Sequence, residues 1–205
     1  MKKNIFLVAT GRTGSSWLEN CFEKCLGYNV VRISTSELRG NRRFEYMVDL
    51  TLEQRVEILN DQDEPWICKL IVDDWDHISL RQIADSYDSQ LIWVWREDIV
   101  DLFLSYAAGV MTYVFNTSDV QGDYKTPEKI VLKDWQLKEF KRMIEIRDKH
   151  WDYYSHLFTH VVEYSTMFDS NPWGFKREDA LGKLNKYTDD HREQARAYLK
   201  DLGLL

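Results

Sequence analysis

Five short apolar runs alternate along the chain with segments whose apolar residues recur at helical spacing. The runs cover residues 5–9, 28–33, 66–72, 90–95 and 160–164. They are rich in β-branched and aromatic residues and have little polar alternation, which is typical of parallel strands buried on both faces. This alternation of strands and helices predicts an α/β protein in three layers (α/β/α), with a central parallel sheet covered by helices on each side.

Helical spacing predicts helices at 15–25, 51–60, 79–86, 98–114, 134–158 and 177–185, and a last one from 188 to Gly203. Thr51 and Gln54 have the spacing of a capping box. Gly203 is placed as the glycine that follows a helix end. The polar stretches 34–44 and 116–127 are predicted to be loops.

Composition narrows the class of protein. A length of 205 residues, 44% hydrophobic and 30% charged, fits one globular domain over residues 1–205. A net charge of −7 disfavours nucleic acid as a partner. No segment reaches the roughly 20 apolar residues of a membrane span, and the first apolar run is too short for a signal peptide. The expectation is a cytoplasmic protein without a membrane partner.

The three cysteines form no CxxC pair and predict no disulfide framework. Cys21 and Cys25 lie one turn apart on the apolar side of the first predicted helix. Both are therefore expected to be buried as small hydrophobic residues.

The first strand leads through a polar turn, Thr10 to Gly14, into a helical pattern that opens at Ser15. A strand, a tight turn and a helix direct backbone N–H groups and the helix dipole at one point, which suits phosphate. Gly11 and Gly14 are expected to allow unusual backbone angles and close approach, and Arg12 adds a positive charge. The Walker pattern GxxxxGK[ST] is absent, so a plain strand–helix connection capped by Ser15 is the alternative.

A second group of candidates follows the fourth strand. Arg96 stands at its carboxyl end, and Ser105 follows on the next predicted helix. A guanidinium and a hydroxyl are donors suited to phosphate. Ligands of parallel sheets lie beyond the carboxyl ends of the strands, so these residues, the first turn and the acids at 73, 74 and 76 are expected to face one crevice. The alternative is a salt-bridged arginine and an ordinary helix serine.

Lys69 is charged but lies inside the third apolar run. That position is costly unless the ammonium meets a partner or the open end of the strand. Lys69 could reach a bound anion there. Equally, it could lie on an edge strand or extend outward to solvent. The histidines at 150, 156 and 160 lack a metal-binding pattern such as HExxH, and no metal is expected.

The segment R-T-G-S-S-W-L, which begins at Arg12, resembles the 5′-phosphosulfate loop of sulfotransferases, [KR]-x-G-[ST]-[ST]-[WF]-L. Arg96 and Ser105 resemble the family's R-[DN]-P-x-x-x-x-x-S motif. Here the serine stands at plus nine instead of plus eight, and Asp98 takes the proline position. The resemblance covers about the first 110 residues, and the family's C-terminal RKGxxGxW loop is not visible.

This resemblance implies a fold like that of P-loop nucleotide kinases. It also implies transfer of a sulfuryl group from 3′-phosphoadenylyl sulfate (PAPS) to a hydroxyl of a carbohydrate or small-molecule acceptor. Arg96 and Ser105 would hold the 3′-phosphate, and Arg12, with Lys69, would neutralise charge on the bridging oxygen. The loop positions that would hold the phosphosulfate are Gly11, Arg12, Thr13, Gly14, Ser15, Ser16 and Trp17.

An acceptor hydroxyl must lose its proton as it attacks, and histidine or glutamate is the usual base. Some bacterial carbohydrate sulfotransferases carry a glutamate after the second strand, which makes Glu37 the first candidate here. His77, soon after the third strand, is the second. Two other functions remain open: a nucleoside or nucleotide kinase with Asp73 as its Walker-B acid, and a non-catalytic nucleotide-binding protein.

Overall fold

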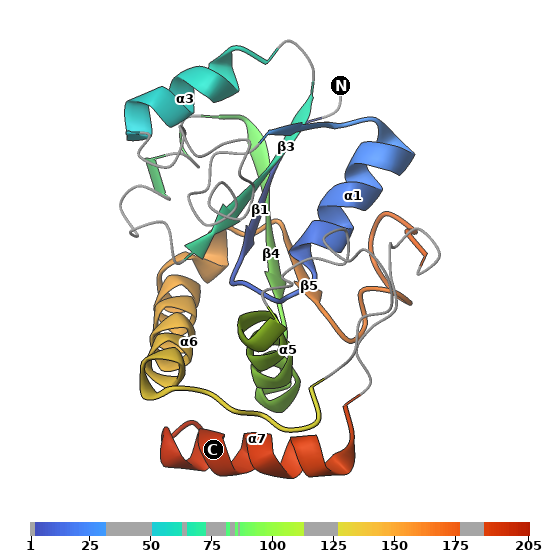
Figure 1. Ribbon diagram of the computed structural model, residues 1–205. Coiled ribbons are helices and arrows are strands. Elements are labelled where there is room, and N and C mark those ends of the chain that lie inside the picture. The colour runs from blue at the N-terminus through green and yellow to red at the C-terminus, as the bar shows by residue number, and fades with distance from the viewer. Residues whose placement is uncertain are drawn as a thin grey trace.

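The computed structural model describes residues 3–31, 51–62, 65–72, 81–82, 85, 87–112, 127–176 and 187–205. Within these ranges five strands form one parallel sheet in the order β2-β3-β1-β4-β5 (Figure 1). The strands are β1 (Asn4–Ala9), β2 (Asn29–Val31), β3 (Trp66–Ile71), β4 (Ser89–Trp95) and β5 (His160–Glu163). All five predicted strands are therefore present. The parallel sheet with helices on its faces confirms the predicted α/β class.

The described helices are α1 (Ser15–Leu26), α3 (Leu52–Asn60), α5 (Ile99–Thr112), α6 (Asp134–Tyr154) and α7 (Asp189–Asp201). The predicted capping box that opens α3 is present. The helix predicted over 134–158 ends earlier than expected and continues as one 3₁₀ turn, η4 (Ser155–Leu157). The helix predicted at 177–185, most of that at 79–86, and the loop stretches 34–44 and 116–126 lie outside the described residues.

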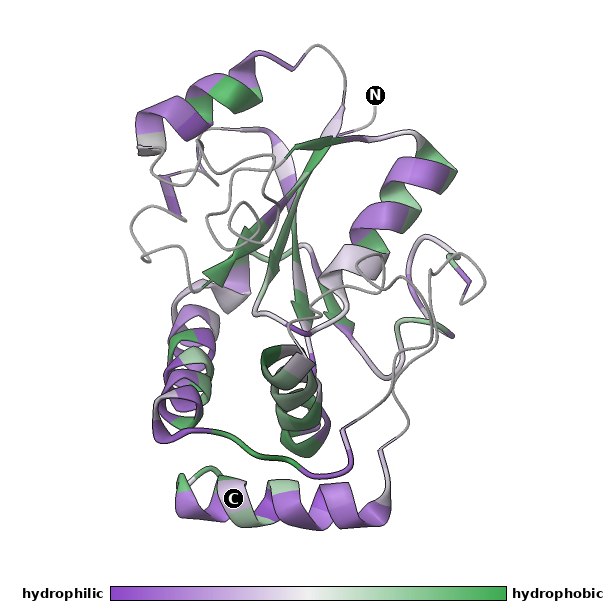
Figure 2. Cartoon of the chain, in the orientation of Figure 1, coloured by the Kyte–Doolittle hydropathy of each residue, from purple (hydrophilic) through white to green (hydrophobic). Residues whose placement is uncertain are grey.

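Side chains along the central strand alternate between two cores, as the geometry of a strand requires. Phe6 and Val8 pack in a cluster that includes residues of α3 and α6. Ile5, Leu7 and Ala9 pack in the cluster formed with α1. The sheet is thus apolar on both faces, and the hydrophobic colour of its strands in Figure 2 follows from this position between two helical layers.

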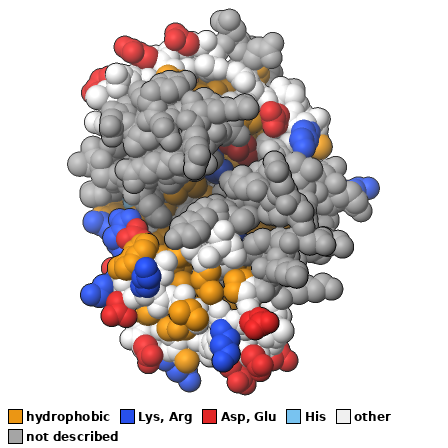
Figure 3. Space-filling model, viewed as in Figure 1, with side chains coloured by type: hydrophobic (Ala, Val, Ile, Leu, Met, Phe, Trp, Pro, Cys, Tyr) orange, Lys and Arg blue, Asp and Glu red, His pale blue; other side chains and the backbone are white. Residues whose placement is uncertain are grey.

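A third core joins α5, α6 and α7 beside the sheet (Figure 1). Phe103 of α5 packs against Phe140 of α6 with ring centroids 5.0 Å apart, and against Tyr198 of α7 at 5.8 Å. On the face shown in Figure 3, hydrophobic side chains gather over the half of the molecule that contains these helices. This packing fixes α7 against α5, the helix that follows β4.

No helix among the described residues is long and apolar enough to cross a membrane. Cys21 is buried as predicted, but the prediction is wrong for Cys25, which is exposed. Cys25 lies in the last turn of α1, just before the left-handed Gly27 that caps the helix. The packed side of α1 continues from Phe22 to the partly buried Leu26, and Cys25 lies outside it.

Candidate functional site

The start of α1 follows the carboxyl end of β1 and has no side-chain cap. Gly14 occupies the N-cap with φ 82° and ψ 8°, and Ser15 is already the first helical residue, so the predicted Ser15 cap is wrong. The N–H groups of Trp17 and Leu18 donate to the Gly14 carbonyl at 3.0 and 3.3 Å. The N–H groups before them precede the first intrahelical hydrogen bond and point out of the helix start. This arrangement favours an anion.

The two loop glycines have different roles. A Cβ on Gly14 would lie 2.7 Å from Cδ2 of Tyr164 and 3.1 Å from Sδ of Met167, and φ there is left-handed. Gly11 has no positive φ, and a Cβ there would meet nothing within 4 Å. The expectation of unusual backbone angles is therefore correct for Gly14 and wrong for Gly11.

The second left-handed residue of the loop is Arg12, with φ 70°. A non-glycine residue in this region costs about 1–2 kcal/mol, and such strain is common at functional sites. The Nε of Arg12 donates to the backbone oxygen of Ser105 at 3.1 Å and to its Oγ at 3.2 Å. The first loop and α5, 93 residues apart in sequence, are thus joined by the side chain of the strained residue.

Two predicted donor-site residues turn their side chains inward. Thr13 is fully buried, and its Oγ1 donates to the Thr10 carbonyl at 3.1 Å. The indole of Trp17 packs edge-on against Phe168 and Phe175, with centroids 4.8 and 6.5 Å away. These side chains hold the loop in its shape from within the core.

Lys69 lies in β3, which is flanked by β1 and β2 and is therefore not an edge strand. Its side chain is only 6% exposed, so it does not extend to solvent. Both alternatives for Lys69, a place on an edge strand and extension of its side chain to solvent, are therefore wrong. Its Nζ donates to Oγ of Ser16 at 3.0 Å and lies 3.8 Å from Oε2 of Glu19, a carboxylate of α1 that is itself 3% exposed.

Sequence reasoning missed Glu19. One signal for it was available: an acid in the middle of the apolar side of the first helix, between Leu18 and Phe22. A buried acid needs a cationic partner, and Lys69 in the third apolar run was the unmatched buried cation.

Arg96 follows β4 and is 8% exposed. Its Nη1 donates to the backbone oxygen of Asp101 at 3.0 Å, and its Cζ lies 3.7 Å from the ring centroid of Tyr164. This ring position provides a cation–π contact. The guanidinium is thus held by a carbonyl oxygen and a ring face, both neutral groups. Gly14 packs against the same ring, so Tyr164 links the first loop to Arg96.

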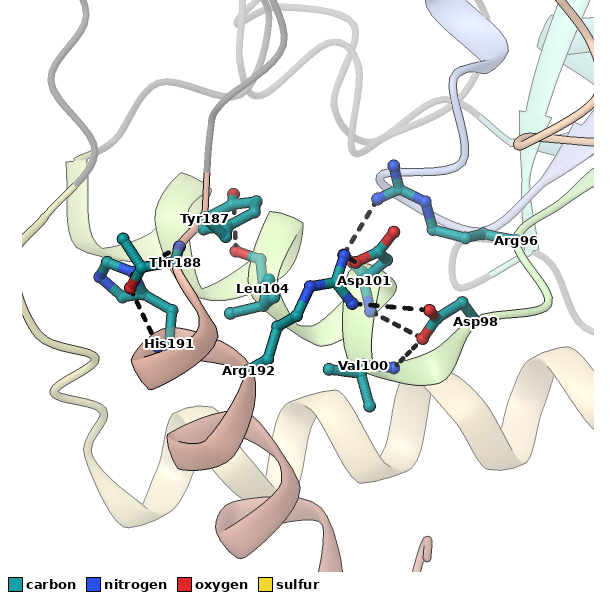
Figure 4. Close-up of polar contacts among 9 residues, drawn as sticks. All are labelled: Arg96, Asp98, Val100, Asp101, Leu104, Tyr187, Thr188, His191 and Arg192. Atoms are coloured by element: carbon teal, nitrogen blue, oxygen red, sulfur yellow. Dashed lines mark hydrogen bonds and ion pairs between the residues drawn. The ribbon is translucent and has the colours of Figure 1, made fainter.

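Asp98 takes the place where the sulfotransferase motif has proline, and it caps α5. Its Oδ1 accepts from the N–H groups of Val100 at 2.8 Å and Asp101 at 3.1 Å (Figure 4). Arg192 of α7 then pairs with Asp101 at 2.6 Å and approaches Asp98 at 3.8 Å. The start of α5 is closed by a side-chain cap and held by a cation from the C-terminal helix.

Several predicted residues are not covered by this geometry. Glu37, His77 and the acids at 73, 74 and 76 lie outside the described residues. Among the residues that are described, no group of three or more His, Cys, Asp or Glu side chains is placed to hold a metal ion.

No family model matches this chain, and no curated protein matches it either. The solved structures that match include a chain from "Molecular and structural characterization of the PezAT chromosomal toxin-antitoxin system of the human pathogen Streptococcus pneumoniae". The likeness has a TM-score of 0.38 at 10% identity and covers 98% of this chain and 88% of that chain. A similarity of this size says nothing about the activity of this protein.

Proposed function

We propose that this protein is a sulfotransferase that moves a sulfuryl group from PAPS to the hydroxyl of a carbohydrate or small-molecule acceptor. The observation that carries the proposal is the pair of hydrogen bonds from Arg12 to Ser105. They join the two segments of the sequence that resemble the donor-binding motifs of sulfotransferases. Chance resemblance of two short motifs would not require their residues to meet in space.

The residues at this site suit the two anionic ends of such a donor. The uncapped start of α1, with Arg12 and the Ser16 hydroxyl beside it, would hold the 5′-phosphosulfate. Arg96 and Ser105 would hold the 3′-phosphate, for which a guanidinium and a hydroxyl are well matched donors. Every contact in this scheme comes from a fixed donor of the chain, and the scheme includes no metal ion.

The transfer breaks the S–O bond between the sulfuryl group and the phosphate and forms an S–O bond to the acceptor oxygen. Adenosine 3′,5′-bisphosphate leaves, and the acceptor proton passes to a base, for which Glu37 and His77 are the candidates. Arg12 would neutralise the charge that develops on the leaving phosphate oxygen. As in phosphoryl transfer, positioning and electrostatic stabilisation would supply most of the rate.

The proposal is tested by incubating the protein with PAPS and each of a panel of sugar and phenol acceptors. Chromatography then measures the adenosine 3′,5′-bisphosphate that is released. Arg12→Ala is expected to lower the rate about 10²–10³-fold, the usual effect of losing a group that stabilises developing charge. Lys3→Ala is the matched control, because Lys3 pairs with Asp88 at the exposed surface and its loss removes the same charge. An Arg12→Ala enzyme with full activity would contradict this role.

The same assay distinguishes a sulfotransferase from a kinase and from a non-catalytic nucleotide-binding protein. A kinase would consume ATP with magnesium and leave PAPS intact. A non-catalytic nucleotide-binding protein would bind without turnover and would be indifferent to substitution of Glu37 or His77.

A further inference from the structure

Arg96 is held in an unusual way for a buried cation. It is only 8% exposed, and a cation buried to this extent normally pairs with a carboxylate. The nearby Asp101 carboxylate is instead paired with Arg192 of α7. Of the five N–H donors of the guanidinium, one on Nη1 bonds to the Asp101 carbonyl, and Nε is buried without a hydrogen-bond partner among the described residues. The other group that holds the guanidinium is the ring of Tyr164.

The ring and the donors of Arg96 use different parts of the guanidinium. Cζ lies 3.7 Å from the ring centroid, which is about the separation of two stacked carbon atoms, so the guanidinium lies with its face on the ring. Its N–H groups lie in the plane of the group and point outward. A ring on the face therefore fixes this plane and leaves the charge and the donor edge for an anion. A carboxylate partner would have taken both.

The backbone places Tyr164 directly beside Arg96. The N–H of Tyr164 donates to the carbonyl of Trp95 at 2.9 Å, and Trp95 is the residue before Arg96. The carboxylate of Glu163 accepts from the N–H of Glu97, the residue after Arg96, at 3.3 Å. The two segments are thus tied together immediately before and after the arginine, which fixes the ring against the guanidinium.

The ring of Tyr164 is also confined by the first loop and by the turn after β5. Its Cδ2 and Cε2 atoms lie so close to Gly14 that a Cβ there would be 2.7 and 2.9 Å from them. Phe168 packs edge-on against the ring, with centroids 5.4 Å apart. A confined ring holds the guanidinium in one orientation before a ligand binds. Donors ordered in advance increase affinity, because less freedom is lost on binding.

We propose that Tyr164 is a positioning residue whose ring face holds the Arg96 guanidinium in the orientation that binds the 3′-phosphate, so that the site selects nucleotides carrying this phosphate. This inference rests on the proposed function, since the 3′-phosphate belongs to the donor. Tyr164 acts through Arg96 and does not itself touch the reacting atoms. The role depends on the electron-rich face of the ring, and the hydroxyl group is not part of it.

Two nucleotides that differ only by the 3′-phosphate measure this role. The ratio of the dissociation constants of adenosine 5′-monophosphate and adenosine 3′,5′-bisphosphate, from calorimetric titration, gives the preference for the 3′-phosphate. Tyr164→Leu removes the ring face and is expected to reduce this preference about three- to ten-fold. Tyr164→Phe keeps the face and should retain the wild-type preference. Tyr153→Leu is the matched control, because it removes a tyrosine ring from an exposed position of α6 and should leave the preference unchanged.

A series of fluorinated rings separates the electrostatic role of Tyr164 from its packing. Fluorine atoms withdraw electron density from the face of the ring and change its volume little. Replacing Tyr164 with phenylalanine and then with its mono-, di- and trifluoro analogues should lower the preference stepwise, while thermal unfolding stays close to that of Tyr164→Phe. If Tyr164→Leu does not fold, this series decides the question alone, since a constant preference across it would overturn the inference.

A double-mutant cycle tests whether Tyr164 acts through Arg96. Arg96→Ala should reduce the preference for the 3′-phosphate at least about ten-fold, through loss of a guanidinium–phosphate contact. Adding Tyr164→Leu to this variant should reduce the preference no further, because the ring then has no guanidinium to hold.

An unchanged preference in Tyr164→Leu, or a further loss when Arg96 is already alanine, would overturn the inference and leave the proposed function standing. An equal loss of both nucleotides in Tyr164→Leu would also overturn it, because that pattern indicates a disturbance of the loop at Gly14. A wild-type protein that does not bind the bisphosphate, or that prefers it no more than the monophosphate, would overturn the proposed function and this inference with it.

Discussion

Two strand-to-helix turns lie next to each other at the carboxyl end of the sheet, and they are built in opposite ways. After β1, helix α1 begins at Gly14 with no side-chain cap and lies over the buried pair of Lys69 and Glu19. After β4, the carboxylate of Asp98 caps the first N–H groups of helix α5. The two strands are hydrogen-bonded neighbours, so this difference arises within one small region.

The difference shows how one structural unit can serve two kinds of recognition. The positive end of a helix attracts one negative group, and in α5 the Asp98 carboxylate already takes that place. Recognition of an anion beside α5 must then depend on side chains, of which Arg96 is the buried example. In α1 the backbone N–H groups stay at the helix start, and the loop side chains supplement them.

The largest difference between the two turns should be in the ion pair that each helix makes, Glu19 of α1 with Lys69 and Asp101 of α5 with Arg192. Glu19→Ala leaves the buried Lys69 ammonium without its carboxylate and is expected to lower the free energy of unfolding by about 3–5 kcal/mol. Arg192→Ala removes a partly exposed pair and should cost no more than about 1 kcal/mol. Urea unfolding of both variants measures the difference. Equal costs would mean that the pair under α1 is no more important than a surface contact.

Gly14→Ala should have the next largest effect. The added methyl group would occupy a left-handed position and press on the ring of Tyr164. Together, strain and overpacking are expected to cost about 2–4 kcal/mol. Gly11→Ala is the control, because its Cβ would meet nothing within 4 Å, and chemical denaturation should place it close to the wild type. Similar losses in the two variants would contradict the distinct roles assigned to these glycines.

Asp98→Ala tests the capped start of α5. Loss of the side-chain cap is expected to lower the free energy of unfolding by about 1 kcal/mol. Asp98→Ser, which keeps an oxygen able to cap, should recover most of that loss in the same thermal or urea unfolding experiment. If serine were no better than alanine, the charge of Asp98 near Arg192 would matter more than the cap.

Arg12→Gly should have the smallest effect on stability. Glycine relieves the left-handed strain while it loses the bonds to Ser105, so the free energy of unfolding should change by less than about 1 kcal/mol. Binding of adenosine 3′,5′-bisphosphate, measured by titration, should nevertheless weaken at least about ten-fold. A variant that lost stability but kept its affinity would show that Arg12 braces the loop instead of binding the ligand.

Much of this architecture could be predicted from the sequence, because patterns of apolar residues report burial on a local scale. The five strands and the capping box of α3 followed from such patterns. Asp98 directly before a helical run is also a cap signal that sequence reasoning could have used. In the sulfotransferase motif the same position holds proline, which carries no side-chain oxygen for a cap.

Other features depend on contacts between distant segments, so a local signal does not identify the partner. The burial of Lys69 beside Glu19 requires α1 to pack over β3, and neither segment alone contains that information. The left-handed angle of Arg12 is equally hidden, since glycine is the residue expected at such an angle. Tyr164 belongs to the site because its ring, placed directly after β5, lies against both Gly14 and Arg96. These contacts are made between distant segments, so the sequence around Tyr164 does not indicate them.

The most direct test of the central claim is calorimetric titration with adenosine 3′,5′-bisphosphate in the presence of EDTA. The wild-type protein should bind without metal, and Arg96→Ala should weaken binding about ten-fold or more, through loss of a guanidinium–phosphate contact. Arg142→Ala, which removes an exposed arginine paired with Glu139, should bind as the wild type does. Absence of bisphosphate binding, together with tight binding of ATP and magnesium, would contradict the sulfotransferase proposal and favour a kinase.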